Sequence, residues 1–177
     1  IWTRDNLVMR ITPRYNPHIN DYWMPDAGRE AYKIFNENRI SRPEVKVDDQ
    51  KIKSSWNNAL LTTSEKIQDI KPNEILVIGS AYASVEDNFA LAKFFGQLGQ
   101  EKTVFTPNIV EGSGDDFLIS DDLAPNTSGC EFLGIDQLDK SKLAAEIASD
   151  QYKLIVILHE DVVGRQIVTA DQLASKF

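Results

Sequence analysis

Two uninterrupted runs of branched apolar residues constrain the fold most strongly. The first covers residues 75–78 and the second residues 154–158, and residues 103–106 form a third, shorter run. A run without polar alternation is typical of a strand buried on both faces, as in a parallel sheet that helices cover on each side. These runs therefore predict the strands of an α/β unit.

Segments with helical spacing of apolar residues separate the runs. Strands that alternate with helices predict right-handed crossovers, and hence a Rossmann-like parallel sheet flanked by helices. The last residues, 167–177, are predicted as a short strand running into a helix, and the Gly- and Asp-rich residues 107–134 show no clear pattern. The predicted helices cover residues 55–70, 84–99 and 143–148.

The first 53 residues follow a different pattern. Period-2 alternation predicts a β-hairpin within residues 1–11, a short helix follows Pro25, and residues 45–52 suggest a second hairpin. We therefore expect a small β-rich head over residues 1–53 and an α/β body over residues 54–177.

Composition excludes several functions. The net charge of -8 repels phosphate backbones, so no nucleic-acid partner is expected. No apolar run approaches the roughly 20 residues that cross a bilayer, so no direct membrane insertion is expected. Cys130 is the single cysteine, which excludes an internal disulfide and a metal site built on thiolates. We interpret Cys130 as a packing residue in a reducing, cytoplasmic compartment.

Gly79, Ser80 and Ser84 follow the first buried run, where open α/β sheets bind ligands. This turn lacks the spaced glycines that let a backbone approach a phosphate. A plain strand-to-helix turn is the preferred interpretation, and the three residues are weak candidates for binding a nucleotide or pterin.

Two other candidates have ordinary structural explanations. Asp115, Asp116, Asp121 and Asp122 could hold a divalent cation, but their spacing matches no EF-hand, and a solvated acidic loop is preferred. His159 ends the second run beside two acids, yet no nucleophile motif accompanies it. The sequence predicts no catalytic residue and no metal site.

The most specific signal lies in the head. It consists of Arg4, Val8, Arg10, Ile11, Pro13, Arg14, Asn20, Trp23, Asp26, Arg29 and Tyr32. This pattern resembles the iron–sulfur module of the molybdopterin oxidoreductase superfamily and is similar to the G-type (75-kDa) subunits of respiratory NADH-quinone oxidoreductase, complex I. The segment Ser-Trp-Asn-Asn-Ala-Leu at residues 55–60 resembles the helix that follows this module.

The resemblance implies a remnant of the iron–sulfur head over residues 1–53 and a truncated Rossmann-like domain over residues 54–177. Cluster-binding relatives carry a fourth cysteine before the Asp of the Trp motif, where this chain has Pro25, and proline cannot ligate iron. The resemblance therefore implies no cofactor in this chain, with iron–sulfur clusters in N-terminal sequence of the parent subunit.

The implied function is that of a non-catalytic scaffold that takes part in electron transfer from NADH only within the complete respiratory complex. Its partners would be other subunits, in the cytoplasm and peripheral to the inner membrane. The alternatives are a nucleotide- or molybdopterin-binding domain of a molybdopterin-type oxidoreductase, and a docking module with an exposed apolar patch.

The motif residues of the head receive structural roles. We expect Arg10 and Arg14 to hydrogen-bond carboxylates such as Asp26, or backbone carbonyls. Trp23 is expected to join Tyr22 and Tyr32 in a compact aromatic core. Asn20 and Arg29 complete the set of motif residues with structural roles.

Overall fold

The computed structural model describes residues 1–48, 50–100, 102–115 and 117–175. The chain forms two compact units, Ile1–Thr63 and Ser64–Phe177.

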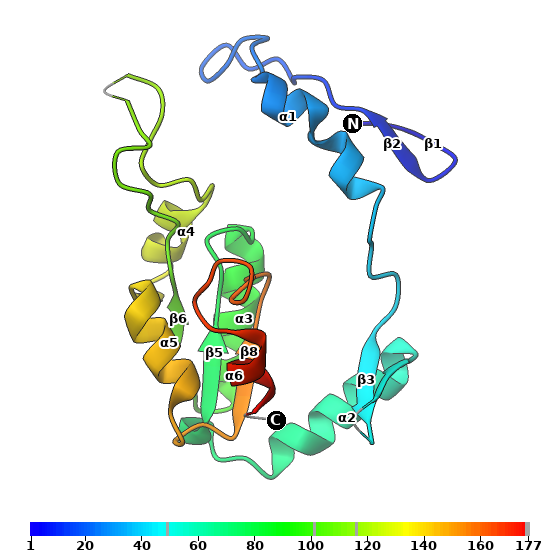
Figure 1. Cartoon of the computed structure of the whole chain (residues 1–177), viewed down its shortest axis with the longest axis vertical. Helices are drawn as coiled ribbons and strands as arrows, with labels where there is room; N and C mark the ends of the chain where they lie inside the picture. Colours follow the sequence, from blue (N-terminus) through cyan, green and yellow to red (C-terminus); the bar gives the residue numbers. More distant parts are fainter. Residues whose placement is uncertain (49, 101, 116, 176–177) are drawn as a thin grey trace. The chain divides into compact units, whose positions relative to one another are not determined.

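The first unit contains two antiparallel hairpins and two short helices (Figure 1). Strands β1 (Trp2–Arg4) and β2 (Leu7–Arg10) pair around a turn in which both Asp5 and Asn6 have positive φ, as tight hairpins require. Both predicted hairpins are confirmed. The other elements are α1 (Asp26–Glu30), the 3₁₀ helix η1 (Ala31–Phe35), β3 (Glu44–Val47) and β4 (Gln50–Lys53).

Helix α2 (Trp56–Gln68) runs from the first unit into the second. It begins where the sequence predicts, because the Ser55 hydroxyl accepts a hydrogen bond from the backbone N–H of Asn58 at 3.2 Å.

The first unit lacks a buried core, since none of its described residues is buried. The predicted aromatic core is wrong: Trp23 is 83% exposed and Tyr22 65% exposed. Among the described residues, the one aromatic ring in contact with Tyr22 is that of Tyr15, with 4.6 Å between ring centroids. Long-range order comes instead from the Asn36 amide, which accepts from the Val8 N–H and donates to the Val8 carbonyl, both at 2.8 Å.

A parallel four-stranded sheet organises the second unit, in the order β7-β6-β5-β8. All four side chains of β5 (Ile75–Ile78) are buried, as the first apolar run predicts. The predicted α/β class with a parallel sheet is confirmed. The other strands are β6 (Thr103–Phe105), β7 (Asp136–Gln137) and β8 (Leu154–Ile157).

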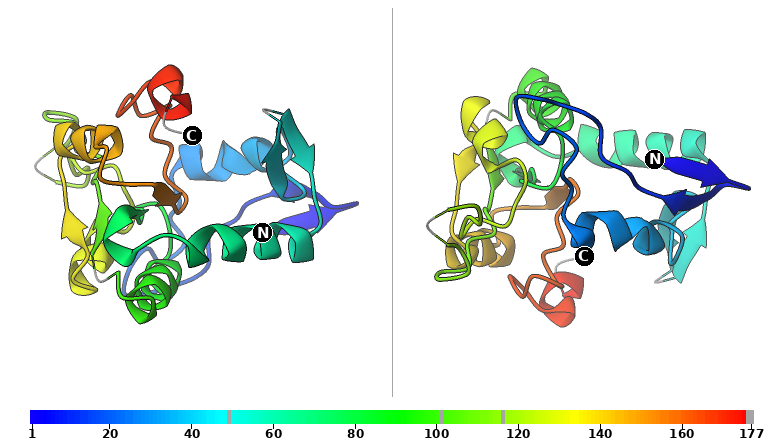
Figure 2. Two further views of the ribbon diagram at one scale, coloured as in Figure 1. Left: turned by 90° about the horizontal axis from the view of Figure 1, so that it is seen from below. Right: turned by 90° about the horizontal axis from the view of Figure 1, so that it is seen from above.

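Helices α3 (Val85–Gln97) and α5 (Lys140–Ala148) lie on opposite faces of the sheet (Figure 2). Side chains of a strand alternate between its faces. Leu76 and Ile78 accordingly share a core cluster with residues of α5, whereas Ile75 and Val77 pack with Phe95 of α3. Shorter helices are η2 (Pro72–Glu74), α4 (Thr127–Phe132) and α6 (Ala170–Ala174).

The C-terminal segment differs from its prediction in part. Helix α6 is present, but no strand precedes it in the described part of this segment. The N–H groups of Ile167 and Val168 both donate to the carbonyl of Val162, so these buried apolar residues close a turn instead of joining the sheet. Among the described residues, no helix is long and apolar enough to span a membrane.

Replacement of Phe105 by Ala tests the core around α4. Phe105 is fully buried with Ala81, Cys130 and Ile135, so Phe105→Ala should lower the free energy of unfolding by about 3–5 kcal/mol. Phe132→Ala is the control, since Phe132 is 85% exposed and its loss should cost within about 0.5 kcal/mol. Urea unfolding of both variants measures the difference, and equal losses would contradict the burial.

Candidate functional site

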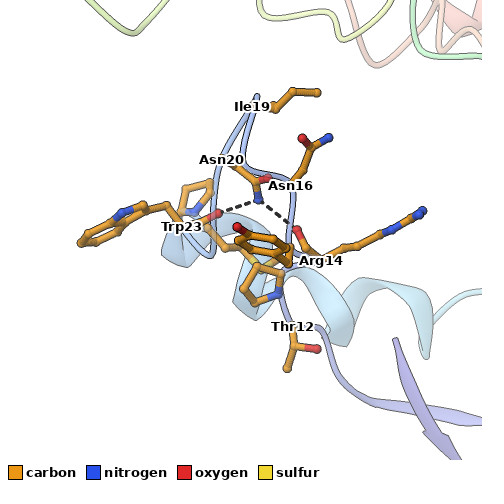
Figure 3. Close-up of a pocket in the computed structure, with 10 residues that line it drawn as sticks. Thr12, Arg14, Asn16, Ile19, Asn20 and Trp23 are labelled. Carbon is orange, nitrogen blue, oxygen red and sulfur yellow. Dashed lines mark hydrogen bonds between the residues drawn. The ribbon is translucent and has the colours of Figure 1, made fainter.

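The loop between β2 and α1 holds several motif residues of the head and lines an open pocket of about 680 Å³ (Figure 3). The Asn20 amide donates to the carbonyl of Trp23 at 3.1 Å and to that of Arg14 at 3.4 Å. These two bonds tie the ends of the loop together. The lining residues are Thr12, Pro13, Arg14, Tyr15, Asn16, Ile19, Asn20, Trp23, Met24 and Pro25.

The charged motif residues do not converge on this pocket. The guanidinium of Arg14 and the indole of Trp23 point away from each other (Figure 3). Among the described residues, neither Arg10 nor Arg14 forms an ion pair or side-chain hydrogen bond with Asp26, so that predicted contact is wrong. Both arginines and Asp26 are exposed, where water competes for their hydrogen bonds. Arg29 is half-buried in α1.

A second candidate site lies where the strand order reverses, at the carboxyl ends of β5 and β8. Here the Asn88 amide accepts from the Ser80 N–H at 3.0 Å and donates to the Ser80 carbonyl at 2.9 Å. A Cβ on Gly79 would lie 2.6 Å from Asn88 Oδ1, so this pairing requires glycine there. Ser84 caps α3 by accepting from the Asp87 N–H at 3.1 Å. Gly79, Ser80 and Ser84 therefore all serve the strand-to-helix turn.

The same edge contains a buried ion pair that no sequence pattern predicted. Arg165 Nη1 lies 2.7 Å from Glu160 Oε1, with 12% and 0% of the two side chains exposed. Arg165 also donates to the carbonyl of Pro107 at 2.7 Å, and its guanidinium carbon lies 5.7 Å from the centre of the Tyr82 ring. Ser80 Oγ lies 3.3 Å from Glu160 Oε2. Only the run of polar residues after the second apolar strand could have signalled this pair.

This arrangement fills the ligand-binding edge with the chain's own side chains. Arg165 joins the segment after β6 to the segment after β8, and Ser80 contacts the same carboxylate. The side chain of His159 is exposed, and the backbone carbonyl of His159 accepts a hydrogen bond from Ser80 Oγ at 3.0 Å. Arg165 neutralises the Glu160 carboxylate, and the Ser80 hydroxyl contacts both that carboxylate and the His159 carbonyl, so the geometry supports a structural role for these side chains.

Cys130 is fully buried, in agreement with its interpretation as a packing residue. Burial, and to a lesser extent the neighbouring Glu131 carboxylate, raises the pKa of the Cys130 thiol. The thiol therefore stays protonated at neutral pH, whereas the thiolate is the form that binds iron or attacks a substrate.

The acidic loop shows no cation site among the described residues. No group of three or more His, Cys, Asp or Glu side chains there could hold a metal ion. One oxygen of Asp115 instead accepts hydrogen bonds from three backbone N–H groups, and these bonds lower its pKa. Asp116 lies outside the described residues.

Residues 1–33 match a family described as "NADH-ubiquinone oxidoreductase NDSU1/NuoG-like, 4Fe-4S domain". The chain is also similar to longer proteins. The G subunit of the NADH-quinone oxidoreductase of Rickettsia conorii is 36% identical over 97 residues, which are 55% of this chain and 14% of that protein. The mitochondrial "NADH-ubiquinone oxidoreductase 78 kDa subunit" of Neurospora crassa is 32% identical over 101 residues, 56% of this chain and 14% of that protein.

The "NADH dehydrogenase [ubiquinone] iron-sulfur protein 1, mitochondrial" of Solanum tuberosum is 28% identical over 109 residues, 61% of this chain and 15% of that protein. The head is thus similar to the iron–sulfur modules of NADH oxidoreductases. Within that class, the predicted resemblance to G subunits of NADH-quinone oxidoreductase is confirmed over about half of the chain. The chain spans about 14% of the length of the relatives that it matches first.

The matching family implies a 4Fe–4S cluster within residues 1–33 itself. The resemblance predicted iron–sulfur clusters in N-terminal sequence of the parent subunit and no cofactor in this chain. The family match agrees with the cofactor class but corrects its location, because the matching 4Fe–4S domain lies within residues 1–33. Such a cluster needs four ligands, normally Cys thiolates. Residues 1–33 contain no cysteine, and Cys130 is buried in the other unit. The residues present therefore do not fit the cluster.

The buried ion pair makes a testable contribution to stability. Arg165→Met leaves the Glu160 carboxylate buried and unpaired, and should lower the free energy of unfolding by about 3–5 kcal/mol. The double variant Glu160→Leu/Arg165→Met should lose less than this single variant, because no charge stays buried. Urea unfolding at pH 7 measures the free energy of unfolding of the unaltered chain and of both variants.

Lys102→Met is the matched control for this ion pair. It removes an ion pair with Glu146 whose side chains are 46% and 28% exposed, and should cost about 1 kcal/mol or less. A cost of Arg165→Met no larger than that of Lys102→Met would contradict the structural role.

Iron content tests the fit of the cluster. The chain, purified without oxygen and incubated with iron and sulfide, should bind no stoichiometric iron and remain colourless, because residues 1–33 supply no thiolate. Pro25→Cys should behave in the same way, since one cysteine leaves three positions without a ligand. Stoichiometric iron and sulfide in the unaltered chain would overturn this conclusion.

Proposed function

We propose that this chain is a non-catalytic scaffold segment of a G-type subunit of a respiratory NADH-quinone oxidoreductase. It takes part in electron transfer from NADH only within the complete complex, where other segments carry the iron–sulfur clusters. Its place is the cytoplasmic, peripheral part of that complex, at the inner membrane. The similarity to G subunits over about half of the chain supports this assignment.

One observation carries the proposal: the first unit has neither a cysteine nor a buried residue among those described. A unit of about 60 residues is marginally stable even with a core, and small folds usually need a disulfide, a metal or a partner. The unit also exposes large apolar side chains, among them Ile19 and Trp23, each 83% exposed. Contact with other polypeptide chains then supplies the stabilisation that the iron–sulfur cluster supplies in iron-binding relatives.

The domain assignment belongs to the same proposal. Residues 1–53 represent the remnant of the iron–sulfur head, and residues 54–177 a truncated Rossmann-like domain. The reversal of strand order beside β5 supports the Rossmann-like assignment. A nucleotide- or molybdopterin-binding role is not favoured, because Arg165 and Glu160 fill the edge at which such a ligand would bind.

Association with the complex is the test. A tagged copy of the chain within its parent subunit, expressed in its own cells, should co-purify with NADH-quinone oxidoreductase activity. Brief protease treatment should cut the isolated 177-residue chain first within residues 1–53, whereas the same residues should resist in the assembled complex. The buried strands β5 and β6 should resist in both and serve as the internal control. Failure to co-purify, or a head that resists equally when free, would contradict the proposal.

A further inference from the structure

The segment 108–123 is here called the finger, and its described residues, 108–115 and 117–123, form a projection that follows β6 (Figure 1). A bridge between Ile109 and Asp122 closes its base, together with a hydrogen bond from the Leu123 N–H to the Asn108 carbonyl at 3.0 Å. Further out, the Asp115 N–H donates to the carbonyl of Ile119 at 2.9 Å. Ladder-like bonds therefore hold the described part of the finger in one conformation.

The tip of the finger is apolar and faces solvent. Phe117, Leu118 and Ile119 are 85%, 80% and 54% exposed. Their three N–H groups donate to one oxygen of Asp115 at 2.9, 2.6 and 2.8 Å. The backbone of the tip is thereby satisfied without any contact between these side chains and a core. Such a cluster of exposed apolar side chains on an ordered loop marks an interaction surface.

The charge around the tip limits what can cover it. The sequence of the finger contains five acidic residues, at positions 111, 115, 116, 121 and 122, and no Lys, Arg or His. Hydrogen bonds from the backbone lower the pKa of Asp115, so its carboxylate is ionised at neutral pH. An anionic surface of this kind repels nucleic acid and anionic lipid headgroups. It attracts a protein surface whose apolar pocket is rimmed by Lys and Arg.

We infer that the finger is a docking element that inserts Phe117, Leu118 and Ile119 into an apolar pocket rimmed by basic residues on another subunit of the same complex. The inference rests on the proposed function, which supplies the complex but assigns no contact surface. Because the tip is held in place before binding, docking loses little conformational entropy. Glu111, which precedes the tip, adds to the electrostatic attraction.

The test places a photo-reactive benzoylphenylalanine at position 117 of the chain, within the parent subunit and the assembled complex. Illumination should cross-link this position to one other subunit, at a peptide that contains Lys or Arg. The same group at Phe132, which is also 85% exposed but lies in α4 outside the finger, should not give that cross-link. Phe117→Ser/Leu118→Ser should weaken co-purification about tenfold or more, while Phe132→Ser should leave it unchanged.

A charge change provides an independent readout. Glu111→Lys should lower the cross-link yield from position 117, and most strongly at low salt. Cross-links only to lipid or only to a second copy of this chain would overturn the inference. So would the absence of any cross-link from a chain that co-purifies normally, and in that case the proposed function stands. A chain that never co-purifies overturns the proposed function itself.

Discussion

Strand β5 lies between β6 and β8 in the parallel sheet, and all four of its side chains are buried. Its backbone bonds are satisfied on both edges, and its alternating side chains pack against α5 on one face and α3 on the other. The polar groups at its carboxyl end depend on this position. Asn88 and Arg165 can each bridge neighbouring segments only because β5 brings those segments together.

The two units differ in how they achieve order. The second unit has three buried apolar clusters, whereas no described residue of the first is buried. Hairpin turns and the paired amide of Asn36 define the head locally, but such bonds contribute only about 0.5–1.5 kcal/mol each. This contrast is why the proposed function assigns the head to a larger assembly.

The charge distribution follows the same division. Residues 1–63 carry ten basic and eight acidic side chains, and residues 64–177 carry nine basic and 19 acidic ones. The acidic excess lies in the unit that also holds the finger, so an apolar tip and an anionic field coincide. Apolar contact would supply affinity there, while the field would select the partner and speed its approach.

The sequence by itself determined the parallel sheet, the helix starts at Ser55 and Ser84, the two hairpins and the family resemblance. These features depend on local spacing, caps and turns, which a single chain segment encodes. Only the tertiary structure decided the pairing of Glu160 with Arg165 and the exposure of Trp23. Glu160 and Arg165 are only five residues apart, but contacts with Ser80 and Pro107 from distant segments enclose the pair. The exposure of Trp23 likewise depends on packing between distant segments, and such packing leaves no periodic signal in the sequence.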